Sequence, residues 1–180
     1  MIRAVLSIGS NMDDRLQLLA TVAKEFKSET VAFSPVYATP PWGVEDQDEF
    51  LNAALIVDVD CTPLELLRRG QGLEEAAERV RLRHWGPRTL DVDVVQVRDL
   101  ETGREITSTD PVLTLPHPYS HQRAFVLVPW LAIEPDARLG GAPATQWLAA
   151  IDQDEIAGVR ELGSLEELLA GQRGTGVGHD

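Results

Sequence analysis

The sequence contains little cysteine and no long apolar run. Cys61 is the one cysteine among 180 residues, which excludes an internal disulfide framework and any cysteine-rich zinc site. No apolar run approaches the roughly 18 residues of a membrane-spanning helix. Residues 1–9 have the length of a strand and are soon followed by acids, which is unlike a signal peptide. We therefore expect a cytoplasmic protein without a membrane partner.

Positive charge is also scarce. Sixteen Lys and Arg stand against 29 Asp and Glu, and the formal net charge is -13. A surface with this balance repels polyanions, so we expect no nucleic-acid partner. The exception is one segment that holds Arg79, Arg81, Arg83 and Arg88 and has no acid before Asp91. This clustering, more than the number of arginines, indicates a local function.

Two common nucleotide-binding motifs are missing. The sequence has neither G-x-x-x-x-G-K-[ST] nor G-x-G-x-x-G, so any nucleotide must bind without a P-loop or a Rossmann turn. What the sequence does have, 43% hydrophobic and 25% charged residues, is the composition of one ordinary soluble domain.

The hydrophobic pattern predicts a mixed fold. Buried apolar runs or alternating β-formers predict strands at residues 3–9, 30–37, 51–59 and 90–97. Helical spacing and capping signals predict helices at about residues 13–27, 62–79 and 121–131. The order β-α-β, β-α-β predicts an α+β fold, a ferredoxin-like sandwich in which helices cover one face of an antiparallel sheet.

We expect residues 1–150 to form one domain. Residues 151–180 have the composition of an acidic C-terminal extension, with one small helix predicted at 165–170. The Gly-rich tail from Gly171 is expected to be disordered, since it offers few apolar side chains for packing.

Asp91 and Asp93 form the first candidate site. They are two residues apart on a predicted strand, so both carboxylates project from one face while Val92 points to the other. Carboxylate pairs suit Mg2+, which keeps waters and substrate phosphates as its other ligands. The alternative is two acids on the wet face of an edge strand, and Asp-x-Asp alone would favour that alternative.

The arginines change this balance. Residues 84–90 run directly into the acid pair, and guanidinium groups beside a metal site suit a polyphosphate. The alternative is a solvated helix end, where bases are favoured; it explains Arg79 and Arg81 better than Arg88.

Aromatic and amide groups offer a place for a flat ring. Residues 39–43, Phe50 and Asn52 lie at the two ends of a long connection. Aromatic faces stack on planar heterocycles, and Asn matches the donor and acceptor edge of a pterin or purine. The alternative is that Phe50 belongs to the core and Asn52 ends a bulge.

Together these segments resemble one family, the 6-hydroxymethyl-7,8-dihydropterin pyrophosphokinases of folate biosynthesis. The resemblance covers roughly residues 1–150, and residues 84–95, HWGPRTLDVDVV, look like the family signature from end to end. Supporting segments follow in the family order at residues 8–11, 39–43, 50–54 and 113–117, with Arg123 and Phe125.

The resemblance implies transfer of pyrophosphate from ATP to 6-hydroxymethyl-7,8-dihydropterin, giving AMP and the pterin diphosphate. It implies two Mg2+ ions held by Asp91 and Asp93. It also implies that Arg79 and Arg88 hold the phosphates. The further ATP-binding residues that it implies are Gln71, Glu74, Arg81, Trp85, Thr114, His117 and Arg123. The pterin-binding residues that it implies are Thr39, Pro40, Trp42, Phe50, Asn52 and Phe125, with the ring between the two phenylalanines.

Two alternatives belong to other classes. A ferredoxin-like module could bind a nucleotide without turning it over, although paired Asp beside Arg argues against this. An RNA-binding module would need a basic face, which the charge of -13 makes improbable. We expect a monomer that acts on small molecules.

Overall fold

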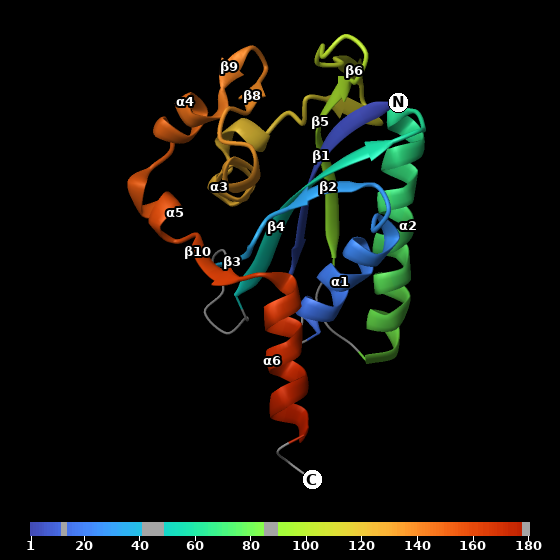
Figure 1. The fold of residues 1–180 in the computed structure, drawn as a ribbon, viewed down its shortest axis with the longest axis vertical. Coiled ribbons are helices and arrows are strands. Elements are labelled where there is room, and N and C mark those ends of the chain that lie inside the picture. Colours follow the sequence, from blue (N-terminus) through green and yellow to red (C-terminus); the bar gives the residue numbers. More distant parts are fainter. Residues whose placement is uncertain (12–13, 41–48, 85–89, 178–180) are drawn as a thin grey trace.

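A computed structural model describes residues 1–11, 14–40, 49–84 and 90–177 of the chain. Its centre is an antiparallel sheet of six strands in the order β10-β3-β4-β1-β5, with β2 also paired to β4 (Figure 1). The strands are β1 Ile2–Ser10, β2 Thr30–Phe33, β3 Val36–Thr39, β4 Phe50–Val59, β5 Asp91–Asp99 and β10 Arg160–Gly163.

One face of the sheet carries the larger core. The helices α1 Arg15–Glu25, α2 Pro63–His84 and α6 Leu165–Val177 lie on this side. Alternate residues of β1, among them Leu6 and Ile8, share this core with Leu19 of α1 and with Phe26, the residue that follows α1, and all four are at most 1% exposed. The period of two along β1 and the helical spacing along α1 therefore meet in one apolar layer.

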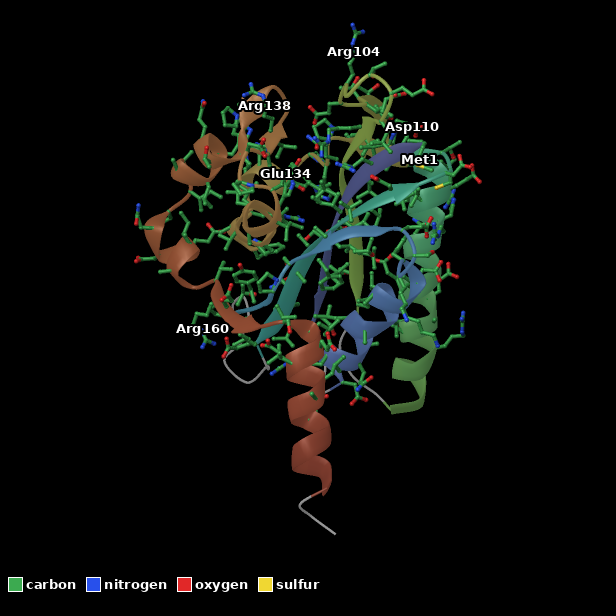
Figure 2. All side chains as sticks on the ribbon, in the orientation of Figure 1. Met1, Arg104, Asp110, Glu134, Arg138 and Arg160 are labelled. Atoms are coloured by element: carbon green, nitrogen blue, oxygen red, sulfur yellow. The ribbon has the colours of Figure 1, made fainter. Side chains whose placement is uncertain are left out.

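The opposite face carries the second core. It is covered by α3 Ala124–Ile133 and α4 Ala144–Ala149, with Glu134 and Arg138 on this side in Figure 2. Val5 of β1 and Val95 of β5 pack here against Leu127 and Trp130, both fully buried. Smaller elements on this side are η1 Ser120–Gln122, β8 Arg138–Leu139, β9 Ala142–Pro143 and α5 Gln153–Ala157. A separate two-stranded sheet, β6 Ser108–Asp110 and β7 Leu113–Leu115, contributes Leu113 and Leu115 to the larger core.

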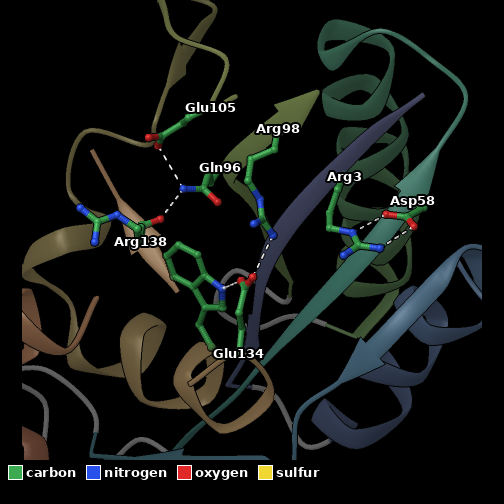
Figure 3. Close-up of polar contacts among 8 residues, drawn as sticks. Arg3, Asp58, Gln96, Arg98, Glu105, Glu134 and Arg138 are labelled. Atoms are coloured by element: carbon green, nitrogen blue, oxygen red, sulfur yellow. Dashed lines mark hydrogen bonds and ion pairs between the residues drawn. The ribbon is translucent and has the colours of Figure 1, made fainter. Parts of the chain in front are cut away.

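The same face ends in a polar network beside the start of β1 (Figure 3). Arg3 donates two hydrogen bonds to Asp58, at 2.8 and 2.9 Å. Arg98 donates to one carboxylate oxygen of Glu134 at 2.9 Å, and the indole N–H of Trp130 donates to the other at 2.8 Å. The first pair ties β1 to β4, and the contacts of Glu134 tie β5 to the end of α3.

The prediction of an α+β sandwich with an antiparallel sheet and packed helices is confirmed, but its helices cover both faces instead of one. The strand predicted at 30–37 is divided into β2 and β3. Pro35 has no N–H to donate at this point. Ser34 fills the break, since its N–H donates to Ala54 O and its hydroxyl accepts from Ala54 N–H.

The C-terminal extension is more ordered than its composition predicts. Its strand β10 joins the main sheet, and Leu165, 8% exposed, joins the larger core. The helix α6 continues through Gly171 to Val177, so the prediction of disorder was wrong for this stretch. Each glycine costs a helix about 1 kcal/mol, but an anchored first turn lets the helix propagate. Within the described ranges, no helix combines the length and apolarity needed to cross a membrane.

Candidate active site

A cavity of about 1020 Å³ lies beside the ends of β1, β4 and β5. The η1–α3 turn and the segment before β10 also border it. The cavity brings together eight of the predicted site residues: Thr39, Pro40, Phe50, Asn52, Asp91, Asp93, Arg123 and Phe125. Segments from positions 39 to 125 thus meet at one place because three neighbouring strands end there.

The register of the sheet sets the spacing of this site. Gly9 on β1 pairs with Asn52 on one side and with Asp91 on the other. A Cβ on Gly9 would lie 2.8 Å from Oδ1 of Asn52, a separation that real Cβ atoms essentially never show. Glycine is therefore required for the Asn52 amide to lie over this point of β1.

The amide of Asn52 is buried and oriented. Asn52 is 5% exposed, and its Nδ2 donates to the Thr39 hydroxyl at 2.9 Å. Phe50, two residues earlier on β4, is half-buried at the cavity, as is Phe125 at the start of α3. An oriented amide and two aromatic side chains in one cavity suit one edge and both faces of a flat heterocycle.

The carboxylate pair has the predicted arrangement. Asp91 and Asp93 both line the cavity, while Val92 between them is 5% exposed and belongs to the larger core. The start of β5 is held from α2, since the Val92 N–H donates to Oε2 of Glu74 at 2.9 Å. Glu74, a predicted ATP ligand, thus has a structural contact directly behind the acid pair.

Arg123 stands over the same acids. Its Nη1 lies 3.9 Å from Oδ2 of Asp93, beyond hydrogen-bond distance. The guanidinium carbon also lies 5.7 Å from the ring centres of both Tyr119 and Phe125, within cation–π range. A cation that is close to the acid and not hydrogen-bonded to it is available to an incoming anion.

His117 lies nearby without lining the cavity. Burial lowers the pKa of His117 below its usual value; Asp93 opposes this shift, and Arg123 adds to it. Its Nδ1 accepts the N–H of Tyr119 at 3.2 Å. A neutral ring with Nδ1 as acceptor leaves Nε2 as the donor, which suits a contact to phosphate.

Other predicted residues stand outside the cavity lining described here. Gln71 accepts a hydrogen bond from Arg68, and the Thr114 hydroxyl donates to Asp110 O. Arg79 is exposed on α2. Four more lie outside the described residues or their described side chains: Trp42, Arg81, Trp85 and Arg88.

Some lining residues carry no prediction from the sequence. Ser7, Tyr119 and Gln122 are of this kind, and the last two could have been suspected because they lie between His117 and Arg123. The others belong to the C-terminal extension and match no motif: Asp152, Asp154, Glu155, Gly158 and Val159.

The donor set fits Mg2+. Among the described residues, no three or more His, Cys, Asp or Glu side chains gather as a metal cluster. Asp91 and Asp93 instead offer hard oxygen ligands at the edge of a cavity. Because Mg2+ retains waters and takes substrate phosphates as ligands, two carboxylates are a sufficient protein share.

An antiparallel α+β sandwich whose strand ends present an amide, aromatic rings and an acid pair to one cavity defines a domain that binds small molecules. A family model described as 7,8-dihydro-6-hydroxymethylpterin-pyrophosphokinase (HPPK) matches residues 5–135. The chain belongs to this family.

Relatives support the membership along most of the chain. The 2-amino-4-hydroxy-6-hydroxymethyldihydropteridine pyrophosphokinase of Mycobacterium bovis is 47% identical over 168 residues, 89% of each chain. That of Methylorubrum extorquens is 41% identical over 160 residues, 87% of this chain and 98% of its own.

A solved structure agrees in fold. Wild-type HPPK-DHPS of Plasmodium falciparum matches 83% of this chain with a TM-score of 0.59 at 14% identity. The chain spans 43% of the length of that protein. At this identity the likeness supports the fold alone.

Proposed function

We propose that the protein transfers pyrophosphate from ATP to 6-hydroxymethyl-7,8-dihydropterin. The hydroxymethyl oxygen forms a bond to the β-phosphorus, the bond from that phosphorus to the α,β-bridging oxygen breaks, and AMP leaves with the bridging oxygen. The hydroxyl proton goes to solvent. The products are AMP and 6-hydroxymethyl-7,8-dihydropterin diphosphate, and the second of these is used in folate biosynthesis.

One observation carries this proposal: a single cavity is lined by the amide and aromatic groups of a ring pocket and by the acid pair of a phosphate site. The names of the relatives support the same reaction. A regulatory module that only binds nucleotide would need no pocket for a second ring in the same cavity as the phosphate site.

The pterin half consists of Thr39, Pro40, Trp42, Phe50, Asn52 and Phe125. Asn52, oriented by Thr39, pairs with the amide-like edge of the ring, and an unpaired edge there would cost about 1–3 kcal/mol. Phe50 and Phe125 hold the two faces, each stack contributing on the order of 1 kcal/mol.

The ATP half consists of arginines and polar groups. Arg79 and Arg88 hold the phosphates as bidentate donors. The remaining contacts come from Gln71, Glu74, Arg81, Trp85, Thr114, His117 and Arg123. The proximity of Arg123 to Asp93 supports its part in this set.

Asp91 and Asp93 would hold Mg2+, two ions in all. The metal would supply neutralisation of the charge on the transferring group. The chain itself positions the hydroxymethyl oxygen by holding the ring, which replaces an encounter in solution with a fixed approach. A dedicated base is not required, because this chemistry depends mainly on position and charge.

We also propose a cytoplasmic monomer that acts on small molecules and not on nucleic acid, in keeping with the charge of -13. Residues 1–150 carry all of the residues assigned above, and residues 151–180 are an addition to that domain.

The deciding experiment combines the protein, ATP, Mg2+ and the hydroxymethyl dihydropterin and identifies the nucleotide product. We expect AMP in equal amount to the pterin diphosphate. ADP would indicate ordinary phosphoryl transfer, and no product despite binding of both ligands would favour the binding module.

A further inference from the structure

Residues 152–160 form one wall of the cavity, although the matched family region ends at residue 135. Gly158 and Val159 line the cavity, as do Pro40 and Phe50, and Gly158 lies against Pro40. The wall continues directly into β10, which pairs with β3: Arg160 lies opposite Ala38, the residue before Thr39. The pairing of β10 with β3 thus places the wall beside Thr39, one residue of the pterin half.

Gly158 faces the pterin half at close range. A Cβ at this position would lie 3.4 Å from Cδ of Pro40. The backbone of Gly158, with φ -71° and ψ -14°, is in the right-handed helical region. Any residue can adopt this conformation, so the backbone does not require glycine here. A larger side chain would instead extend toward Pro40, at the edge of the cavity.

A charged pair fixes the other side of the wall. Arg160, at the left edge of the sheet in Figure 2, forms an ion pair with Glu49. Glu49 also accepts a hydrogen bond from Arg15 through its carbonyl, at 3.1 Å. Phe50 follows Glu49, so Arg160 holds the residue from which β4 and its aromatic side chain begin.

The charge of the wall indicates what it faces. Asp152, Asp154 and Glu155 all line the cavity from this side. Three carboxylates disfavour the polyphosphate of ATP at this end and are compatible with an uncharged ring. This assigns the wall to the pterin half and not to the ATP half.

We propose that residues 152–160 determine which pterins the site accepts, with Gly158 leaving the space beside Pro40 and Arg160 acting as a positioning residue for Phe50. The proposal rests on the function proposed above. It assigns to the C-terminal extension a part in the choice of substrate.

The first test narrows the cavity by adding a side chain to the wall at Gly158. In Gly158→Leu the added side chain competes with the ring for space, and we expect the Kd of 6-hydroxymethyl-7,8-dihydropterin to rise about tenfold or more. The Kd of a non-hydrolysable ATP analogue should stay within about twofold. Ala157→Leu is the matched control, because Ala157, the exposed last residue of α5, precedes Gly158 and does not line the cavity; it should change neither value. Calorimetric titrations of each ligand give these numbers, and thermal unfolding reports whether each variant folds.

The second test removes the positioning pair. Because both side chains are partly exposed, Arg160→Ala should raise the KM for pterin by only about two- to fivefold, with kcat nearly unchanged. Arg160→Lys should restore the wild-type KM, and Arg104→Ala, an exposed arginine at the far end of the molecule, should match wild type. A purely structural role would lower stability without this split between KM and kcat.

The outcomes separate the two proposals. If the wild-type protein binds no pterin, the proposed function fails and the wall has no role. If wild type binds pterin and forms AMP while Gly158→Leu binds pterin normally, the proposal for the wall alone is overturned. Equal weakening of pterin and the ATP analogue would overturn it as well.

Discussion

At one end of the sheet face that α3 covers, Arg3 and Asp58 pair at 2.8 and 2.9 Å, whereas at the other end Arg123 stands 3.9 Å from Asp93. The first pair joins β1 to β4, and the second joins β5 to the start of α3. At the first end the two charges are hydrogen-bonded to each other and hold β1 to β4. We call this end, with the neighbouring Arg98 and Glu134, the fastened end, and the other the cavity end. At the second end the cation and the acid form a longer ion pair, beyond hydrogen-bond distance, beside a cavity. Charge that is not consumed by folding is available to a ligand.

The largest expected effect breaks the cavity end. Asp93→Ala, and almost as strongly Asp91→Ala, should lower kcat by about a thousandfold or more, because a metal-binding carboxylate contributes several kcal/mol to the transition state. The melting temperature should change by no more than about 2 °C, since neither side chain is in the core. The rate of AMP formation at saturating Mg2+ measures this. A near-normal rate in either variant would show that Asp91 and Asp93 are surface acids and not metal ligands.

The second effect breaks the fastened end. Glu134→Ala removes the acceptor of both Arg98 and the fully buried Trp130. Arg98 Nε already lacks a hydrogen-bond partner among the described residues. We expect a loss of about 2–3 kcal/mol in the free energy of unfolding, with kcat unchanged where the protein is folded. Urea titration measures the loss. Glu134→Gln, which keeps the acceptor for Trp130, is the control and should lose less; a fall in kcat in either variant would contradict the comparison.

The third effect separates pterin binding from ATP binding at the cavity end. Phe125→Ala and Asn52→Ala should each weaken pterin binding by about tenfold or more, through lost stacking and an unpaired amide edge. Binding of the ATP analogue should be almost unchanged. Separate calorimetric titrations of the two ligands decide this. Equal losses for both ligands, or none, would place these residues in the core and not in a pterin pocket.

The smallest effect is a pH dependence at the fastened end. The hydrogen bond from Arg3 lowers the pKa of Asp58 below its usual value. The pair therefore stabilises the fold above the unfolded pKa, near pH 4, and this contribution is lost as the pH falls through the lower folded value. Both side chains are partly exposed, so Arg3→Met should lose about 0.5–1 kcal/mol at pH 7. In urea titrations the difference between the two proteins should start to shrink below about pH 4 and vanish only below the lower folded pKa of Asp58. A constant difference would show that Arg3 acts through packing.

Residues of the cavity end could be predicted from the sequence, whereas the contacts of the fastened end could not. Asp91 and Asp93 could be proposed because the period of two along a predicted strand puts both carboxylates on one face. Asn52 could be proposed from the chemistry of its amide and from the resemblance. The corner formed by Arg98 and Glu134 could not, because nothing local indicates that the end of α3 meets β5. Side-chain partners of this kind depend on how helices dock, which a periodic pattern does not encode.

The wall at residues 152–160 was missed for a related reason. It contains no motif, and its place depends on the pairing of β10 with β3, more than 120 residues earlier in the chain. Pairings at such separations follow from the completed sheet. Gln71 and Thr114 show the converse case, since the resemblance assigns them to ATP but their described contacts are with Arg68 and Asp110.

The pairing of Gly9 with Asn52 and Asp91 fixes the distance between the two halves of the site. The amide and the acid stand on either side of one strand, so two strand spacings, about 9–10 Å, separate their backbones. That length is set by main-chain hydrogen bonds and not by any side chain. Substitutions can therefore weaken either half of the site without changing the distance between the halves. A protein that needed a longer reach between ring and phosphate could obtain it only by a shift in strand register, which would also turn the core residues of β1 outward.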